Sequence, residues 1–302
     1  MPSDTLPAAP GKPVPGAADG SRRRRRGSRS WLGTLPLLVF AAVCFGLPVG
    51  FVVYGALTTD QGGATHATGA NLSTSLHGAY LGSLTGSVEL SALTALIGCV
   101  LGMLIAQAVV TSRRGALRES VLTASGVLAN FGGVPLAFAF VATLGISGVV
   151  TQIAHLGSAG WSLYSFPGLV VIYLYFLIPL MVLVSVPALD GLRPQWREAA
   201  QNAGATTGQF WRHVGIPVLA PTLLGGFVLL FGSAFAAYAT AAALVGGSVP
   251  LVTLKIADAL SGNVQVGQEN VALALSADMI VIAGLVMAVY LPLQRRSTRW
   301  LH

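Results

Sequence analysis

Long apolar runs separated by short polar segments dominate the pattern of this chain. Six stretches contain no Asp, Glu, Lys or Arg: 30–59, 61–88, 90–112, 120–189, 213–254 and 279–294. A helix that crosses about 30 Å of hydrocarbon needs roughly 20 apolar residues. The pattern therefore predicts an all-α integral membrane protein.

Helix-breaking residues divide the longest of these runs. The 70 uncharged residues of 120–189 would form one helix of about 105 Å, which is too long for a single crossing. Glycines, serines and a Pro-Gly pair interrupt the run between residues 145 and 168, and such residues mark turns. We therefore expect six transmembrane helices, over about 31–57, 84–110, 121–144, 167–189, 218–245 and 271–293. A short helix is expected near 251–260.

Composition excludes an ordinary soluble protein. The chain is 54% hydrophobic and 9% charged, with a mean hydropathy of +0.73, whereas globular domains contain about 25% charged residues. Cys44 and Cys99 lie inside apolar runs, so they indicate neither a disulfide framework nor a metal site. The five histidines show no paired ligand spacing.

The positive charges predict the orientation of the chain. Sixteen of the 17 Lys and Arg residues fall on one side of a six-span arrangement, and only Lys255 falls on the other. Because cytoplasmic loops retain positive residues, we expect both termini in the cytoplasm. Residues 1–30 are expected to form a disordered basic tail, and 31–302 the transmembrane domain. Basic segments beside spans usually set topology, so we do not expect nucleic-acid binding.

One polar segment, 193–217, has distinctive local chemistry between the fourth and fifth spans. Pro194 suits a first helical position, and Gly204 suits the left-handed residue just past a helix end. Thr206 with Gln209 forms a capping-box pattern that opens a second short helix. The segment is therefore expected to contain two short helices.

The second of these helices is expected to close at Gly215 and Pro217. The first would carry a narrow ridge on one face with polar shoulders, a shape that fits a groove on another protein. The ridge residues are Trp196, Ala199, Ala200 and Ala203. The shoulder residues are Arg197, Glu198, Gln201 and Asn202. A solvated connecting hairpin would have similar caps but would not favour this ridge.

The segment resembles the Glu-Ala-Ala loop of permease subunits of binding-protein-dependent ABC importers. The matching residues are Glu198-Ala199-Ala200, Gly204 and Val214-Gly215-Ile216-Pro217. Valine and isoleucine replace two of the aliphatic residues in that family's pattern, and the spacing agrees. The resemblance extends more weakly over about 84–293.

This resemblance implies that the chain forms half of a solute pathway with a second permease subunit, either a paralogue or a second copy. The first loop helix would bind a cytoplasmic ABC ATPase dimer, and Ile216 and Pro217 would close the loop. The residues expected to contact the ATPase are Trp196, Arg197, Glu198, Ala199, Ala200, Asn202, Ala203 and Gly204. An extracytoplasmic solute-binding protein would deliver the solute to this multi-pass protein of the bacterial cytoplasmic membrane.

The resemblance also implies that another chain binds and hydrolyses ATP. ATP-Mg would bind the partner ATPase, because neither Lys12 nor Lys255 follows the spacing of a phosphate-binding loop. The chain itself, surrounded by membrane lipid, is expected to bind no cofactor and to catalyse no reaction. The layout is most similar to permeases for polyamines, phosphonates, iron, thiamine or small oxyanions.

Polar residues inside the spans leave a second interpretation open. Burying a carboxylate in a membrane is costly, so Glu89 or Asp278 could be the proton site of a secondary transporter. Each could equally face the helix bundle or water, and a membrane anchor is a third alternative. The residues that could line a pathway, or could instead form interhelical hydrogen bonds, are Glu89, Asn130, Tyr173, Tyr175, Ser233, Tyr238 and Asp278.

Overall fold

The computed structural model divides into two compact units, which we describe separately. The first ends at Pro48 and the second begins at Val49. In the first unit, α1 (Ser30–Ala41) and the π turn η1 (Ala42–Gly46) lead into α2. The expected basic tail lies, except for Ser30, outside the described residues. The structure describes residues 30–61, 64–112, 114–158, 160–245, 248–261 and 268–298.

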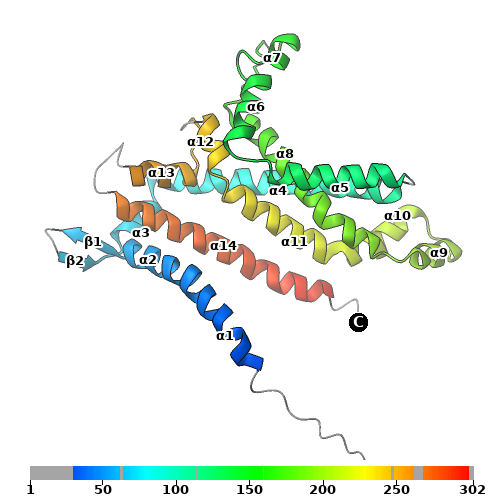
Figure 1. The fold of residues 1–302 in the computed structure, drawn as a ribbon, viewed down its shortest axis with the longest axis horizontal. Coiled ribbons are helices and arrows are strands. Elements are labelled where there is room, and N and C mark those ends of the chain that lie inside the picture. Colours follow the sequence, from blue (N-terminus) through cyan, green and yellow to red (C-terminus); the bar gives the residue numbers. More distant parts are fainter. Residues whose placement is uncertain are drawn as a thin grey trace, which may run out of the picture. The chain divides into compact units, whose positions relative to one another are not determined.

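The second unit is almost entirely helical (Figure 1). Its elements begin with the end of α2 (Leu47–Ala56), β1 (Thr58–Gln61), β2 (Ala64–Ala67), α3 (Ala70–Ser75), α4 (Gly78–Thr111), α5 (Gly115–Asn130), α6 (Val134–Leu144) and α7 (Val149–Ile153). They continue with α8 (Phe166–Asp190), α9 (Pro194–Asn202), α10 (Thr207–Phe210), the π turn η2 (Trp211–Gly215), α11 (Ile216–Phe235), α12 (Ala239–Val245), α13 (Val252–Ser261) and α14 (Glu269–Thr298). The two strands pair antiparallel, with Thr58 opposite Ala67.

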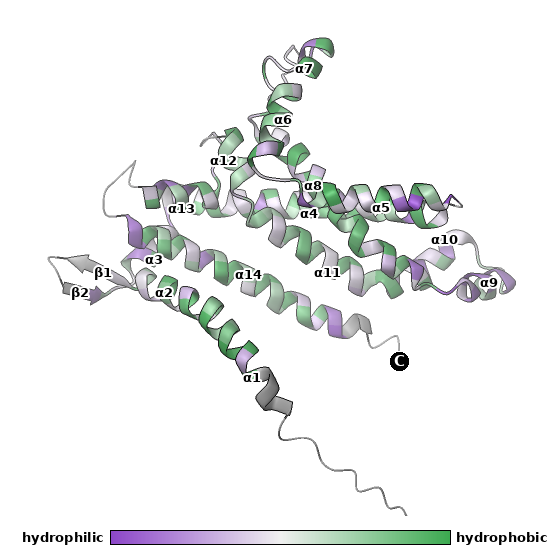
Figure 2. Ribbon diagram, in the orientation of Figure 1, coloured by the Kyte–Doolittle hydropathy of each residue, from purple (hydrophilic) through white to green (hydrophobic). Residues whose placement is uncertain are grey.

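The predicted number of spans is confirmed. Among the described residues, six helical segments are long and apolar enough to cross a membrane: Leu35–Ala56, Gly78–Thr111, Val134–Ile153, Phe166–Asp190, Thr207–Phe235 and Glu269–Arg295. Hydrophobic residues predominate along these helices (Figure 2). The short helix expected near 251–260 is also present, as α13.

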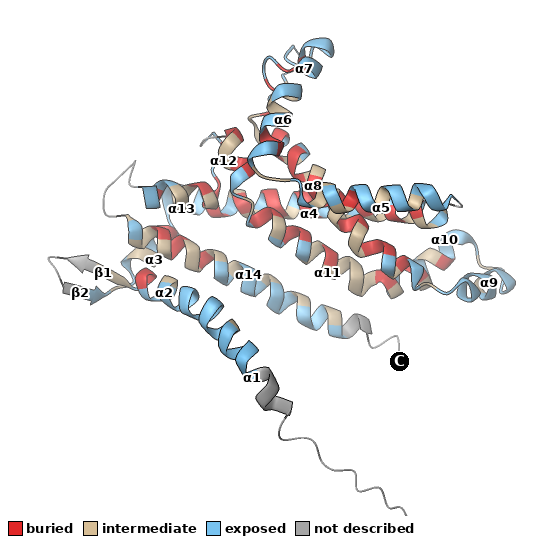
Figure 3. Cartoon of the chain, in the orientation of Figure 1, coloured by how far each residue is buried: buried red, intermediate tan, exposed pale blue. Residues whose placement is uncertain are grey.

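Glycines allow α4, α8 and α11 to approach closely around Met181 of α8, which is fully buried. A Cβ atom on Gly102 of α4 would lie 2.5 Å from Met181 Cβ, and one on Gly226 of α11 would lie 2.5 Å from Met181 Sδ. One turn before Gly102, a Cβ atom on Gly98 would lie 3.0 Å from Leu230 Cδ2. Small residues permit such close contact between membrane helices. These three helices therefore contain much of the buried interior (Figure 3).

The third predicted span is wrong in its boundaries. We expected one helix over 121–144, but α5 ends at Asn130 and α6 begins at Val134. Between them, Gly133 has φ 75°, a left-handed conformation that glycine adopts without steric cost. Pro135, in the first turn of α6, has no backbone N–H with which to continue the helix of α5. The Gly-Gly-Val-Pro sequence is therefore the physical cause of the break.

The fifth predicted span is also interrupted. We expected one helix over 218–245, but α11 ends at Phe235 and α12 begins at Ala239. Neither glycine nor proline lies in the gap. Instead, the Tyr173 hydroxyl of α8 donates a hydrogen bond of 3.0 Å to the backbone carbonyl of Ala237. A side chain from another helix thus replaces a helical hydrogen bond.

Replacing Gly102 by leucine tests the close packing at Met181. The added side chain would have to displace Met181, and overpacking of this kind costs typically about 1–3 kcal/mol. We expect Gly102→Leu to lower the thermal unfolding temperature of the detergent-purified chain. Gly82→Leu is the matched control, because no described atom lies within 4 Å of the Cβ position of Gly82 in the same helix. Equal unfolding temperatures for the two variants would contradict the packing argument.

Candidate partner-binding loop

The 193–217 loop presents α9 as an exposed helix. None of the nine residues of α9, all of which the structure describes, is buried. Trp196 is 36% exposed although its side chain is largely apolar. The helix is more hydrophilic than the spans (Figure 2) and is exposed along its length (Figure 3). Because helices this short are marginal in water, α9 depends on its caps.

Both ends of α9 lie at the residues that the sequence predicted. Pro194 occupies the first turn, and Gly204 follows the helix with φ 79°. The Ala205 N–H donates to the Ala200 carbonyl, and the Gly204 N–H donates to the Gln201 carbonyl, both at 2.9 Å. This pair of bonds is a Schellman motif, which needs a left-handed residue at the helix end. The motif ends α9 and turns the chain toward α10.

The predicted capping box is confirmed at the start of α10. The Thr206 N–H donates to Gln209 Oε1 at 2.8 Å, and the Gln209 N–H donates to Thr206 Oγ1 at 3.3 Å. The two bonds satisfy backbone donors that have no partner at a helix start. Local sequence alone therefore orders α9 and α10, the two arms of the loop.

The predicted closure at Gly215 and Pro217 is wrong, because the chain continues as one helical segment over Thr207–Phe235. In the π turn, the Ile216 N–H donates to the Trp211 carbonyl five residues back. Such a turn can accommodate the missing N–H of Pro217 without ending the helix. A Cβ atom on Gly215 would lie 2.5 Å from the Trp211 ring, so glycine provides room for this turn. Ile216 and Pro217 thus join the loop to α11 instead of closing it.

A concave region of about 430 Å³ lies between the two arms of the loop. Small residues form its α9 side, and aromatic and polar residues form the other. The lining residues are Ala200, Ala203, Gly204, Ala205, Gln209, Phe210, His213 and Val214. Around it, three arginines outnumber the one carboxylate of the loop, Glu198. The loop therefore offers a basic, partly apolar surface.

An ion pair anchors the start of the loop. Arg118 Nη2 of α5 lies 2.5 Å from Asp190 Oδ2, at the last residue of α8. The two side chains are 41% and 36% exposed, so solvent screens the pair to about 0.2–1 kcal/mol. The contact links α5 to the point where α8 enters the loop.

The two carboxylates of the spans lie in different surroundings. Glu89 of α4 is exposed, whereas Asp278 of α14 is 8% exposed. The Asp278 Oδ2 atom is buried and has no hydrogen-bond partner among the described residues. Only Asp278 is therefore enclosed by protein.

The tyrosines of α8 face the protein interior. Tyr173 is 1% exposed and bonds to the Ala237 carbonyl. The ring of half-buried Tyr175 contacts the ring of Phe140 edge to face, with centroids 5.6 Å apart. These contacts favour interhelical packing over pathway lining for both residues.

The other polar candidates gather near the two helix breaks. Asn130 is the last residue of α5, is exposed, and donates to the Gly126 carbonyl at 2.9 Å. Tyr238, 45% exposed, lies in the gap before α12, and half-buried Ser233 lies in the last turns of α11. Sequence reasoning missed Thr240, which bonds across the breaks. Its only sequence signal is a hydroxyl in an apolar run.

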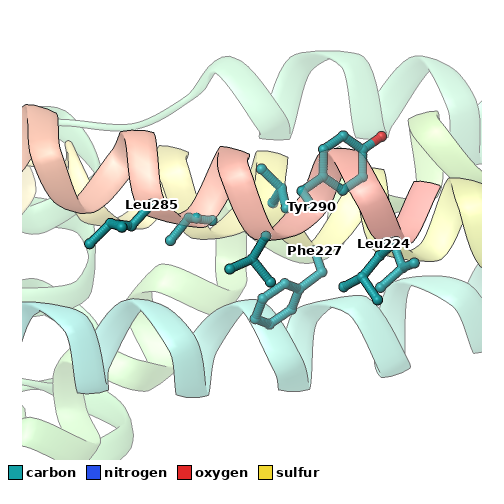
Figure 4. A pocket seen from close by; sticks show the side chains of 8 residues that line it. Leu224, Phe227, Leu285 and Tyr290 are labelled. Carbon is teal, nitrogen blue, oxygen red and sulfur yellow. The ribbon is translucent and has the colours of Figure 1, made fainter. Parts of the chain in front are cut away.

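A pocket of about 350 Å³ between α11 and α14 has an apolar lining (Figure 4). Leu224 and Phe227 come from α11, and Leu285 and Tyr290 come from α14. Ligand sites for polar solutes need several placed polar groups, and here the lining is almost wholly hydrocarbon. This pocket suits a lipid chain or another apolar helix better than a polar solute.

The family profile described as the binding-protein-dependent transport system inner membrane component matches residues 98–299. The chain belongs to this family. It is thus a multi-pass permease component, which agrees with its six apolar helices.

Curated relatives of this permease match it over a short stretch. The sulfate transport system permease protein CysT of Salmonella typhimurium is 40% identical over 68 residues, which cover 22% of this chain and 24% of the relative. The CysT protein of Escherichia coli is 37% identical over 68 residues, with the same coverage. The match therefore spans about a quarter of the length of these relatives.

Two solved structures share the fold of the permease. One is a bacterial ABC transporter involved in the import of the acidic polysaccharide alginate, with a TM-score of 0.69, 19% identity and coverage of 90% of this chain and 96% of that chain. The second is a bacterial alginate ABC transporter in complex with an alginate pentasaccharide-bound periplasmic protein, with a TM-score of 0.65, 19% identity and coverage of 90% and 95%. At this identity the likeness concerns the fold alone.

Variants of Gly204 test whether its left-handed conformation orders the loop. A β-branched residue is strained there by about 1–3 kcal/mol, whereas asparagine tolerates that conformation. We expect Gly204→Val to increase proteolysis within 193–217 without lowering the unfolding temperature of the spans. Gly204→Asn is the matched control, because no described atom lies within 4 Å of the Gly204 Cβ position. Equal proteolysis of both variants would show that the cap does not order α9.

Proposed function

We propose that this chain is the permease subunit of an ATP-driven importer, which forms half of a solute pathway and couples to a separate ATPase through the 193–217 loop. One observation carries the proposal: α9 begins at Pro194, ends in a Schellman motif and is exposed along its length, and after a short turn the continuous helical segment Thr207–Phe235 follows it. An exposed amphipathic helix of this kind fits a groove on a partner protein. Family membership supports the same assignment.

The connection to α11 supports a mechanical role. A partner that binds α9 and then moves displaces the loop, and the unbroken segment Thr207–Phe235 carries that displacement into the span. Because α11 packs against α4 and α8 through glycines such as Gly226, the displacement reaches the buried centre. Trp196 and the small residues of α9 provide the contact ridge for a groove on the partner.

The proposed arrangement needs three further components. The positive-inside rule supports a cytoplasmic location of the 193–217 segment, beside the ATPase dimer, because the loop and both termini are basic. A second permease completes the pathway, and an extracytoplasmic solute-binding protein delivers the solute. The complex of the fold neighbour with a periplasmic protein supports the last of these. ATP-Mg binds the ATPase and not this chain.

The proposed solute is a small oxyanion, with sulfate as the first candidate. The two CysT relatives are named as sulfate permeases, which favours oxyanions over polyamines, thiamine or iron. The alginate transporters share only the fold, so they carry no argument about the solute. Family membership likewise disfavours a self-sufficient secondary transporter that uses Asp278 or Glu89.

Charge reversal on α9 tests the coupling role. Glu198 is exposed and half-way along α9, so Glu198→Arg changes the contact surface without disturbing buried packing. We expect the variant to insert into the membrane but to lose about tenfold or more in affinity for the ATPase, equivalent to about 1.4 kcal/mol. Co-purification and titration of the ATPase measure this loss. Glu119→Arg is the matched control, because Glu119 is an exposed residue of α5 outside the loop. Unchanged affinity and transport in Glu198→Arg would refute the coupling role.

Radiolabelled sulfate tests the proposed solute class. We expect the assembled transporter in proteoliposomes to take up sulfate only with internal ATP and the solute-binding protein. Unlabelled spermidine and thiamine serve as competitors of other chemical classes and should not reduce the uptake. Inhibition by either one, or absence of sulfate uptake by a complex that transports another solute, would contradict the oxyanion assignment.

A further inference from the structure

The break between α5 and α6 lies against the start of α12. Thr240 of α12 is buried and bonds to Gly133, in the gap between α5 and α6. The Gly133 N–H donates to Thr240 Oγ1 at 3.0 Å, and the Thr240 hydroxyl donates to the Gly133 carbonyl at 3.4 Å. One side chain therefore serves both backbone groups of the residue at which the third span is interrupted.

A second bond holds the other break to the inner helices. The Tyr173 hydroxyl of α8 donates to the Ala237 carbonyl, in the gap between α11 and α12. Tyr173 is buried, and its ring centroid lies 5.6 Å from that of Phe176. The α11–α12 gap is thus linked to α8 on one side and, through Thr240, to α6 on the other.

Beyond the breaks, α6 and α12 form a packed pair (Figure 1). Their contact-facing residues are almost wholly buried and belong to one hydrophobic cluster with residues of α8 and α11. These residues are Leu136, Ala137, Ala241, Leu244 and Val245. Each helix of the pair is thus separated by a break from the helix that precedes it in the chain. We call α6 and α12 the outer pair.

We propose that Thr240 is a positioning residue that joins α6 to α12, so that the outer pair moves as one unit when α11 is displaced. This inference rests on the proposed function. Breaks between helices are the places where backbone torsion angles change in hinge motions. Backbone groups in a membrane cost several kcal/mol when they lose their partners, so the bonds between Thr240 and Gly133 persist while the hinge bends. Displacement of α9 and α11 thereby reaches α6, which no continuous helix connects to the loop.

Distances between spin labels test whether α6 and α12 move together. In a chain with Cys44→Ala and Cys99→Ala, one label pair joins Phe138→Cys of α6 to Ala242→Cys of α12. A second pair joins Phe138→Cys to Val127→Cys of α5. In the assembled transporter, we expect ATP with vanadate to leave the first distance unchanged and to shift the second. Separation of α6 from α12, or no change in the second distance, would overturn the inference.

Substitutions of Thr240 separate positioning from simple stability. Thr240→Val removes both bonds at nearly the same volume, and we expect ATP-driven sulfate uptake to fall by about tenfold, because the Gly133 N–H loses its partner. ATPase binding should remain, and Thr240→Ser should restore uptake. Thr143→Val is the control, because the Thr143 hydroxyl bonds only within α6, to Ala139 and Phe140. Wild-type uptake in Thr240→Val would overturn the inference.

Failure of this inference is distinguishable from failure of the proposed function. A wild-type chain that neither binds an ATPase nor transports any solute contradicts the proposed function. A wild-type transporter that does both, while α6 and α12 separate during the ATP cycle, contradicts only the role of Thr240. The distances in the wild-type helices decide this even if Thr240→Val does not accumulate in the membrane.

Discussion

A bilayer interior contains no water to hydrogen-bond a peptide group, so every interruption of a membrane helix needs a partner from elsewhere in the protein. Two of the spans expected from the apolar pattern are interrupted in the structure, and specific side chains bond to backbone groups at these interruptions. Thr240 serves Gly133, and Tyr173 serves Ala237. These bonds decide where the helices bend and which helices are joined at the bend. The arrangement of the outer pair, α6 and α12, depends on them.

The inner helices, α4, α8 and α11, depend on close packing instead. With lipid around the bundle, the hydrophobic effect does not hold helices together, so contact area matters more. Gly102 and Gly226 create that area by leaving room for Met181 between α4 and α11. A close-packed centre responds to force as a body, because interiors have little free volume. Close packing of this kind supports the proposed transmission of movement from α11 to α4 and α8.

The loop combines local order with an uncovered surface. Its caps, including Gly204 and the Thr206–Gln209 box, satisfy its helix ends without help from the bundle. The ridge of α9 is left free for a partner, while η2 joins the loop to a span without interruption. The proposed coupling role rests on this combination of local order, exposure and connection to a span.

Composition and local spacing determined six apolar helices, the two ends of α9 and the capping box of α10, because hydropathy and capping depend on neighbours in the chain. The Gly-Gly-Val-Pro sequence after Asn130 also signals the break there, although the apolar pattern concealed it. The gap at Ala237 has no such signal in the sequence, because no residue there breaks a helix. The hydrogen bond to Ala237 comes from Tyr173, 64 positions away. Likewise, only tertiary packing exposed Glu89 and enclosed Asp278. Hydrogen bonds and burial between distant segments depend on how the helices are placed in space, which local sequence does not encode.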